Sequence, residues 1–306
     1  MSKVLVTGGL GFIGTNLVAE LRRRGHEVWT CDILHGEAES HFRCDVSSFV
    51  QLSQVFSEQA FDYVYHLAAE YGRWNGEDHY ENLWTTNAIG TKNILRLQEK
   101  YQFRLIFFSS AEVYGDYEGI MDEDVLDRIP IKQMNDYALS KWVGELQVLN
   151  SALMFGTESV RVRPVNAYGP FEYYSPYRGV IPIFVYRALT GKPYTVYLGH
   201  IRIFDYVEDT CRTFANILDN FIPGAVYNVG SREEWKTDIK YVSDLILDYV
   251  GHDDSLVEYK NGEPFTTRTK QIDFSKARRD LKHDPQVPIE DGVPRYIEWM
   301  KKAYHL

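Results

Sequence analysis

Tyr137 and Lys141, in the stretch DYALSK, combine residue types and a spacing that can move a proton. Because they lie four residues apart on a predicted helix, their side chains share one face. A free phenol has a pKa of ~10, and lowering it by about three units requires ~4 kcal/mol of preference for the phenolate. An ammonium ~4–5 Å away, at an effective dielectric constant of ~20, supplies roughly that amount. The pair therefore predicts a base for a hydroxyl group, although the spacing alone is common on helix surfaces.

Glycines in the stretch TGGLGFIG predict a dinucleotide site. Gly8, Gly11 and Gly14 fall between a predicted strand and a predicted helix, where glycine lets a pyrophosphate approach the helix N-terminus. Asp32 ends the next predicted strand, where its carboxylate can accept hydrogen bonds from ribose hydroxyls and would repel a 2′-phosphate. We therefore expect NAD rather than NADP. The alternative is a structural glycine turn with a surface aspartate.

Asp45 and Val46 end the following short strand, and we expect them to flank the adenine. The alternative for Asp45 is that it caps the helix that follows.

Predicted strands and helices alternate through the first half of the chain, and short connections between them demand a parallel sheet with helices on both faces. We expect an α/β fold: a Rossmann doubly wound parallel sheet with a smaller C-terminal lobe. The NAD-binding domain is assigned to residues 1–167 plus about 205–230. The substrate-binding lobe is assigned to about 168–204 and 231–306. The Tyr-, Pro- and Gly-rich stretch that begins near residue 167 is predicted to line a ligand cleft, with irregular core as the alternative.

The composition excludes several classes of partner. The chain has 306 residues, of which 44% are hydrophobic, and a net charge of −10, so no basic face is available to nucleic acid or to an anionic membrane. The N-terminus shows no apolar signal core and no run of ~18 apolar residues occurs, so we expect a cytoplasmic protein. Three cysteines without CxxC or zinc spacing predict structural thiols and no metal site.

A series of motifs resembles, in order and spacing, the extended short-chain dehydrogenase/reductase family, in its nucleotide-sugar epimerase/dehydratase branch. The resemblance covers nearly the whole chain. The segments that carry it are TGGLGFIG, the acidic end of the second strand, HLAA at 66–69, TNAIGT around Asn87, SSAEVYG, YALSK, RPVNAYGP, LGHIRIFDYVED and IDFSKARRDL.

The resemblance implies roles for individual residues. Tyr137 is expected to act as base or acid on the sugar C4 hydroxyl. Lys141 is expected to lower its pKa and hold the nicotinamide ribose, and Ser110 to bond the same sugar oxygen. The implied contacts to NAD extend to Phe12, Ile13, Leu67, Ala68, Ala69, Asn87 and Pro164.

The resemblance also implies a substrate, a nucleotide-diphosphate sugar with a UDP, dTDP, GDP or CDP carrier. Asn166, Arg202 and Arg268 are placed like residues that hold its phosphates or its nucleoside, with a surface or structural role as the alternative for each. Glu70, in HLAAEYG, looks like a substrate residue of the family's dehydratases.

The run Ser110, Ala111 and Glu112 leaves the reaction open. The family's 4,6-dehydratases carry an aspartate acid and then a glutamate base after the Ser/Thr, whereas this chain keeps the glutamate and has Ala111 instead of the aspartate. Simple 4-epimerases resemble it in the Ser-Ala pair but usually lack the third carboxylate, and hexuronate decarboxylases usually show Thr-Ser-Glu. Beside a 4-keto intermediate, Glu112 can remove the C5 proton that the carbonyl makes acidic. The alternative is that Glu112 only hydrogen-bonds the wall of the cleft.

We therefore expect an NAD-dependent nucleotide-sugar epimerase or dehydratase that acts through oxidation at C4. A net C4 oxidase and a hexuronate decarboxylase stay as alternatives. A different class, a protein that binds NAD and a sugar nucleotide without turnover, also stays open. Two predicted helices, at about 80–100 and 137–155, resemble those that pair between subunits in this family, so a homodimer is expected by analogy.

Overall fold

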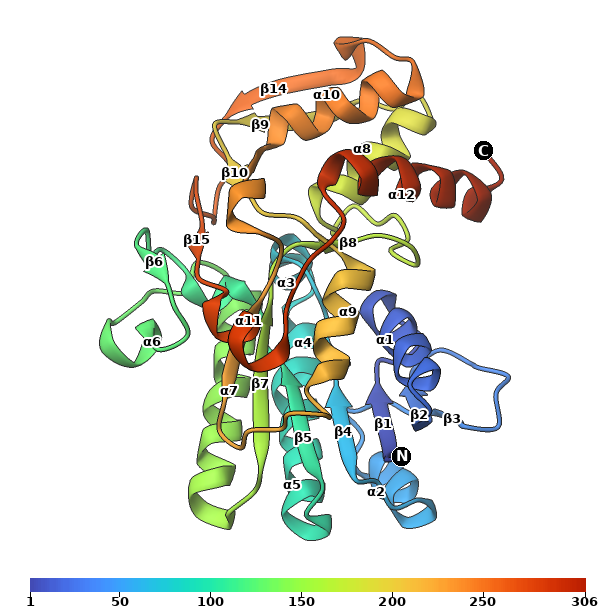
Figure 1. The fold of residues 1–306 in the computed structure, drawn as a ribbon, viewed down its shortest axis with the longest axis vertical. Helices are drawn as coiled ribbons and strands as arrows, with labels where there is room; N and C mark the ends of the chain where they lie inside the picture. Colours follow the sequence, from blue (N-terminus) through green and yellow to red (C-terminus); the bar gives the residue numbers. More distant parts are fainter.

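A parallel seven-stranded sheet forms the centre of the protein (Figure 1), which a computed structural model describes over all 306 residues. The strand order is β12-β7-β5-β4-β1-β2-β3, and every pairing is parallel. This confirms the predicted doubly wound sheet. Its strands are β1 (Lys3–Thr7), β2 (Glu27–Asp32), β3 (His41–Arg43), β4 (Tyr63–His66), β5 (Arg104–Phe108), β7 (Ser159–Pro164) and β12 (Val226–Val229).

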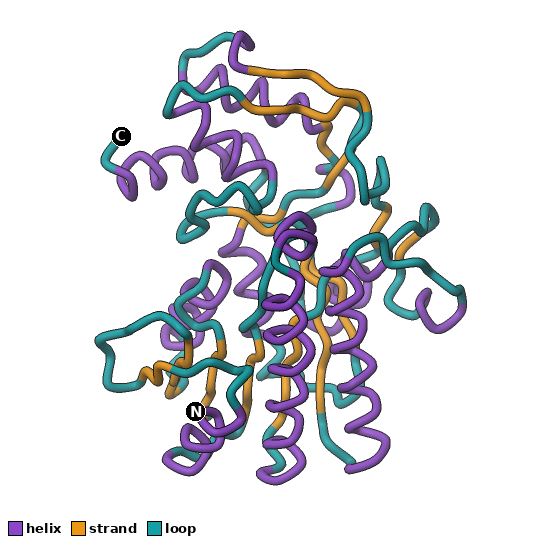
Figure 2. The backbone as a smooth tube through the Cα atoms, turned by 180° about the vertical axis from the view of Figure 1, so that it is seen from behind, coloured by secondary structure: helices purple, strands orange, loops and turns teal.

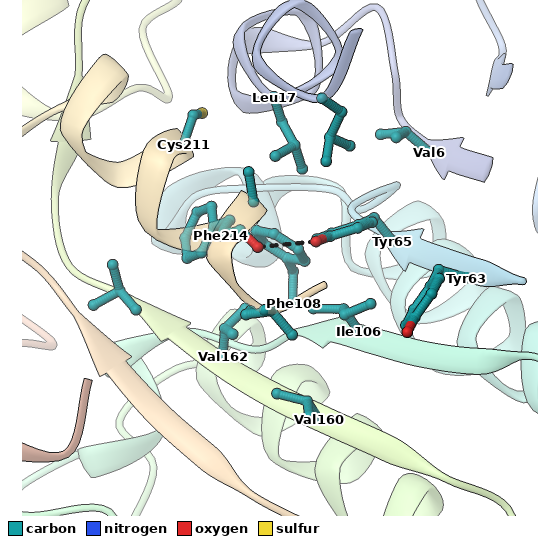
Figure 3. Packing of buried hydrophobic residues seen from close by; sticks show 14 of the residues in the cluster. Val6, Leu17, Tyr63, Tyr65, Ile106, Phe108, Val160, Val162, Cys211 and Phe214 are labelled. Atoms are coloured by element: carbon teal, nitrogen blue, oxygen red, sulfur yellow. Dashed lines mark hydrogen bonds between the residues drawn. The ribbon is translucent and has the colours of Figure 1, made fainter. Parts of the chain in front are cut away.

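Helices cover both faces of this sheet, because successive strand residues point to opposite sides. In β1, Val4 and Val6 face α1, α9 and α11, whereas Leu5 faces α2, α5 and α7. Figure 3 shows the first face, where the Tyr65 hydroxyl donates a hydrogen bond to the Phe214 carbonyl at 2.9 Å. The covering helices are α1 (Phe12–Arg23), α2 (Phe49–Glu58), α5 (Thr91–Tyr101), α7 (Asp136–Phe155), α9 (Val207–Asn216) and α11 (Ser275–Leu281).

The helix predicted at about 80–100 is not uniform. It consists of α4 (Tyr80–Trp84), the π-helical turn η1 (Thr85–Gly90) and α5, and the short helix α3 (Arg73–Asp78) precedes it. Single π turns inside helices are frequent at functional sites. Here the π turn carries Asn87, one of the predicted cofactor residues.

A second hydrophobic core lies beyond the sheet, at the top of Figure 1. It is formed by α8 (Val180–Leu189), β9 (Tyr194–Leu198), α10 (Ile239–Val250), β14 (Val257–Asn261) and α12 (Ile289–Tyr304). This core corresponds to the predicted smaller C-terminal lobe, seen from behind in Figure 2. The exact domain boundaries stay a prediction.

Shorter elements complete the secondary structure. They are η2 (Ala111–Tyr114), β6 (Ile120–Met121), α6 (Val125–Arg128), β8 (Ala167–Tyr168), β10 (Ile201–Arg202), β11 (Asp205–Tyr206), η3 (Glu233–Trp235), β13 (Thr237–Asp238), η4 (Asp254–Leu256) and β15 (Gln271–Ile272). Among all the helices, none has the length and apolar character needed to cross a lipid bilayer. The cytoplasmic location stays a prediction.

Candidate active site

The predicted cofactor residues lie along one edge of the sheet. Because all seven strands are parallel, their carboxyl ends meet at the same edge, which is where open α/β sheets bind ligands. The predicted residues follow or end five of these strands: Gly8 after β1, Asp32 in β2, Leu67, Ala68 and Ala69 after β4, Ser110 after β5, and Pro164 in β7.

The glycine turn between β1 and α1 packs too closely for side chains. A Cβ on Gly14 would lie 2.1 Å from the Gly8 carbonyl oxygen, and one on Gly8 would lie 2.8 Å from the Ala68 nitrogen. Gly8 also has a φ of +67°, which favours glycine. Gly11 is the N-cap of α1, and Phe12 and Ile13 form its first turn. The backbone can therefore bring a pyrophosphate against the free N–H groups of this helix.

Asp32 is held beside this turn. One carboxylate oxygen accepts from the Leu10 amide at 3.0 Å and the other from the Leu34 amide at 3.1 Å. A carboxylate has about four lone-pair sites, so acceptor capacity is left for ribose hydroxyls. The glycine turn and the fixed acid together fit the adenosine diphosphate half of NAD.

Asp45 and Val46 are placed differently from each other. Asp45 accepts from the Ser47 amide at 2.8 Å, and it is Ser48, not Asp45, that caps α2. Val46 is buried and lies where a Cβ on Gly90 would touch it. A contact of either residue with adenine stays a prediction.

Tyr137 and Lys141 lie in the first two turns of α7 and are both buried. The Lys141 ammonium donates to the Phe108 carbonyl at 2.9 Å and lies 6.0 Å from the centre of the Tyr137 ring. The Tyr137 ring packs edge-on against Tyr71, with 5.5 Å between ring centres. Lys141 is thus fixed at the end of β5.

Burial dominates the titration of this pair in the protein alone. It raises the pKa of Tyr137, as do Tyr71 and Glu112, while the Ser110 hydroxyl lowers it. Burial also lowers the pKa of Lys141 to about 7. Lys141 is not among the main groups that shift the pKa of Tyr137 in the protein alone, and a phenol pKa lowered by Lys141 stays a prediction. Desolvation disfavours the charged form of both groups.

Ser110 and Glu112 sit at the start of the 3₁₀ turn η2. Ser110 caps this turn, and its hydroxyl accepts from the Glu112 amide at 3.2 Å. One Glu112 oxygen accepts from the Lys270 ammonium at 2.5 Å. Burial alone would raise the pKa of Glu112, but Lys270 and then Arg73 offset this, so its pKa lies below the usual value. Glu112 is therefore an ionised carboxylate at neutral pH.

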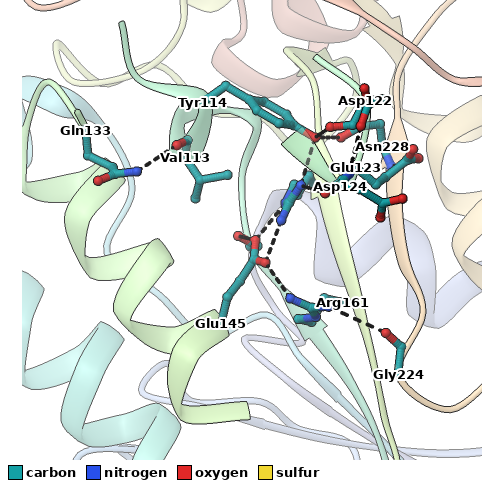
Figure 4. Close-up of polar contacts among 12 residues, drawn as sticks. Val113, Tyr114, Asp122, Glu123, Asp124, Gln133, Glu145, Arg161, Gly224 and Asn228 are labelled. Carbon is teal, nitrogen blue, oxygen red and sulfur yellow. Dashed lines mark hydrogen bonds and ion pairs between the residues drawn. The ribbon is translucent and has the colours of Figure 1, made fainter. Parts of the chain in front are cut away.

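A buried ion network supports η2 from below (Figure 4). Glu145 accepts two hydrogen bonds from Arg163, both at 2.8 Å, and one from Arg161 at 3.1 Å. Arg163 also donates to the Tyr114 hydroxyl at 2.8 Å, and Ser109 donates to Glu145 at 2.5 Å. The network joins β7 and α7 to both ends of the Ser109–Tyr114 segment. It holds Ser110 and Glu112 in place.

Glu70 and Asn87 are linked to each other. The Glu70 amide donates to the Asn87 side chain at 2.8 Å, and the Asn87 amide group donates to the Ser140 hydroxyl at 2.9 Å. The Glu70 carboxylate accepts from Asn75 at 3.0 Å and from Asn82 at 2.7 Å. These bonds tie the segment after β4 to α7, one turn beyond Tyr137.

Two of the other predicted substrate residues, Arg202 and Asn166, bond to backbone carbonyls. Arg202 donates to the carbonyls of Thr267 and Arg268, both at 2.7 Å. Arg268 itself is exposed. Asn166 has a φ of +39° and donates to the Ile203 carbonyl at 2.9 Å. Arg202 thus fastens the backbone of residues 267–268, and the phosphate contacts of all three residues stay predictions.

Sequence reasoning missed three residues beside Glu112: Lys270, Arg73 and Tyr71. Lys270 lies 158 residues from Glu112 along the chain and belongs to no motif with regular spacing. Arg73 donates to Glu263 at 2.8 Å, and its other terminal nitrogen is buried without a partner. The only available signal was the position of Lys270 just before the family-like segment IDFSKARRDL.

The fold and this edge define a dinucleotide-binding α/β protein of the Rossmann type. A sequence model described as "NAD dependent epimerase/dehydratase family" matches residues 4–230. The chain belongs to this family, it is an enzyme of the family's kind, and its cofactor is NAD.

Known relatives catalyse different reactions. The chain is 30% identical over 317 residues to a UDP-N-acetyl-α-D-glucosaminuronate decarboxylase of Bacillus cytotoxicus, covering 98% of each protein. The UDP-glucose 4-epimerase of Thermotoga maritima, solved with UDP-glucose, superposes with a TM-score of 0.88 at 26% identity over 99% of each chain. The dTDP-glucose 4,6-dehydratase of Bacillus anthracis, solved with NAD, gives 0.85 at 25% identity over 100% of this chain and 98% of the other.

Proposed function

We propose that the protein oxidises C4 of a nucleotide-linked sugar and then removes the C5 proton with Glu112, in a cycle that returns the cofactor to its starting state. The observation that carries this proposal is the ionised Glu112 carboxylate, paired with Lys270 close to Tyr137. Relatives that act on UDP- and dTDP-sugars support a nucleotide-diphosphate sugar as substrate.

Tyr137 and Ser110 act on the C4 hydroxyl. The Tyr137 oxygen takes the C4 hydroxyl proton, and the Ser110 hydroxyl interacts with the same tyrosine. Both groups then hydrogen-bond the C4 ketone oxygen. When bound beside these residues, NAD would supply the hydride acceptor for C4 and a positively charged ring that favours the phenolate. Lys141, held by the Phe108 carbonyl, contributes a further positive charge below its pKa of about 7.

Glu112 distinguishes this site from that of a simple 4-epimerase. Inversion of configuration at C4 requires no carboxylate near C5. A base near C5 is useful once the C4 ketone has made the C5 hydrogen acidic. Burial among cations holds Glu112 as the base form. We therefore favour chemistry that passes through C5 over epimerisation at C4 alone.

Decarboxylation of a nucleotide hexuronate is the second candidate, favoured by the likeness to the Bacillus cytotoxicus decarboxylase along 98% of the chain. It begins with the same C4 oxidation, because the resulting β-keto acid loses carbon dioxide easily. The two candidates diverge after C4 oxidation: in the first Glu112 takes a proton from C5, and in the second C5 loses carbon dioxide.

The test is to mix the purified enzyme with dTDP-glucose, UDP-glucose, UDP-N-acetylglucosamine, GDP-mannose, CDP-glucose and UDP-glucuronate. Reduced cofactor is followed by its absorbance and products by mass spectrometry. We expect at least one sugar to give reduced cofactor and a product that has lost water or carbon dioxide. Tyr137→Phe should bind that sugar nucleotide nearly as well yet give no reduced cofactor. If no sugar nucleotide gives reduced cofactor or a product, the result would instead support a binding protein without turnover.

A further inference from the structure

Lys270 lies where it can replace the aspartate acid that is missing at Ala111. Its ammonium lies 2.5 Å from one Glu112 oxygen, and its side chain is 6% exposed whereas that of Glu112 is 25% exposed. No hydrogen bond of the protein involves the second Glu112 oxygen. A base and a proton donor therefore lie side by side.

The backbone around Lys270 is fixed on both sides. Thr269 forms a bridge with Ile201, and the Ile201 amide donates to the Arg268 carbonyl at 2.9 Å. On the other side, Gln271–Ile272 pair in parallel with Ile120–Met121. The Lys270 side chain therefore contacts Glu112 from a residue whose neighbours on both sides are paired.

The surroundings of Lys270 favour release of its proton. Burial lowers the pKa of Lys270, and Arg202 and Arg73 lower it further, while Glu112 acts in the opposite direction. An ammonium carries three N–H donors, and Glu112 uses one of them. Donors remain for a substrate oxygen.

We propose that Lys270 is the acid that protonates the departing C6 oxygen, so that the enzyme carries out 4,6-dehydration of a neutral nucleotide hexose. This inference rests on the proposed function, since it requires a C4 ketone and the removal of the C5 proton.

The step balances as follows. Glu112 takes the C5 proton, a double bond forms between C5 and C6, and the C6–O bond breaks. The C6 oxygen takes a proton from Lys270 and leaves as water. The hydride removed from C4 is then delivered to C6, and Glu112, after its proton has exchanged with solvent, protonates C5. Lys270 regains a proton from solvent, and the product is a 4-keto-6-deoxy sugar nucleotide.

The experiment compares Lys270→Met and Lys270→Arg with the wild-type enzyme. Arginine keeps a positive charge beside Glu112 but does not release a proton in a protein, so it separates the charge of Lys270 from its acidity. Each protein receives the five nucleotide hexoses of the panel and the 6-deoxy-6-fluoro analogue of the hexose that reacts. Fluoride leaves without being protonated, so its loss needs no acid.

We expect wild type to release water from a hexose and both variants to lose about 100-fold or more of that rate, the usual contribution of a general acid. Fluoride release should stay within about tenfold of wild type in Lys270→Arg, and that variant should still incorporate solvent deuterium at C5.

Two results would overturn the inference alone. If the rates of water release and of fluoride release fall by the same factor in Lys270→Arg, Lys270 only supports the structure. If wild type gives reduced cofactor but no hexose loses water, no acid acts at C6. The same holds if the only product is the one that UDP-glucuronate forms by losing carbon dioxide. Absence of reduced cofactor with every sugar would overturn the proposed function as well.

Discussion

Burial sets the charge of the residues that are proposed to move protons. It raises the pKa of Tyr137 and lowers the pKa of Lys141 to about 7, because the protein interior disfavours both charged forms. Glu112 stays ionised because Lys270 and Arg73 face it. The chemistry of each side chain is therefore set by neighbours from distant parts of the chain.

Glu172 offers a test of this influence away from the reacting atoms. It is buried, one of its oxygens has no hydrogen-bond partner, and burial raises its pKa from 4.5 to about 8. Because the folded pKa is the higher one, the neutral carboxyl contributes stability that is complete below pH 4.5 and is lost as the pH rises through about 8.

In the wild-type protein, Glu172 should lower the free energy of unfolding by a few kcal/mol between about pH 5 and pH 8. Glu172→Gln should lack this decrease. Urea unfolding of both proteins across that range measures it. The difference between the two curves isolates Glu172 from other titrating groups. Parallel curves would show that Glu172 reaches solvent.

Individual site residues could be predicted from the sequence where the chemistry depends on residue types at a fixed local spacing. Tyr137 and Lys141 are four positions apart on one helix, and Ser110 and Glu112 lie in one short turn, so they could be found without coordinates. Lys270 could not, because its partner lies 158 residues away and its position just before the segment IDFSKARRDL gives it no chemical role. The inward-facing bonds of Arg202 were hidden for the same reason.

Among the elements, η2 depends most on a single buried group. Glu145 is fully buried and is the only carboxylate that pairs with Arg161 and Arg163. A buried carboxylate that loses its charge leaves both guanidinium groups uncompensated, which costs far more than breaking a surface pair.

Glu145→Gln should accordingly lower the free energy of unfolding by about 3–5 kcal/mol. The control is Glu158→Gln, which removes an exposed pair with Arg104 at 3.0 Å and should cost less than about 1 kcal/mol. Denaturant unfolding gives both values. Equal costs would contradict the assignment of Glu145 as the anchor of η2.

Element types followed from periodicity in the first half of the chain, because strands such as β1, β4 and β5 are mainly apolar and the long helices each bury one stripe. The π turn at Thr85–Gly90 had no such signal, since its apolar pattern fits an ordinary helix. The short strands β6 and β15 also escaped prediction, because two-residue pairings depend on chain segments that meet only in the fold.

For the whole molecule, α7 presents an apolar face that nothing in the protein covers. Leu139, Leu146, Leu149 and Leu153 are exposed, and their spacing places them on one side of the helix. The neighbouring turn η1 exposes Ile89, and α5 packs beside α7 (Figure 1). Contiguous exposed apolar patches are typical of subunit interfaces. This supports the homodimer predicted through these helices.

Leu146→Glu should convert that dimer into a monomer, because a charge would be buried at the centre of the paired helices. Light scattering coupled to gel filtration measures the mass. Val50→Glu, at an 80% exposed position on α2, is the control and should leave the mass unchanged. A wild-type protein that is already monomeric at micromolar concentration would contradict the prediction.

The proposed chemistry depends on removal of the C5 proton by Glu112 after C4 has been oxidised. The most direct measurement is NMR of the product formed in D₂O by wild type and by Glu112→Gln, using the sugar nucleotide that reacts. We predict deuterium at C5 with wild type. With Glu112→Gln we predict reduced cofactor but no deuterium at C5. Deuterium at C5 in the variant at the wild-type rate would contradict the claim.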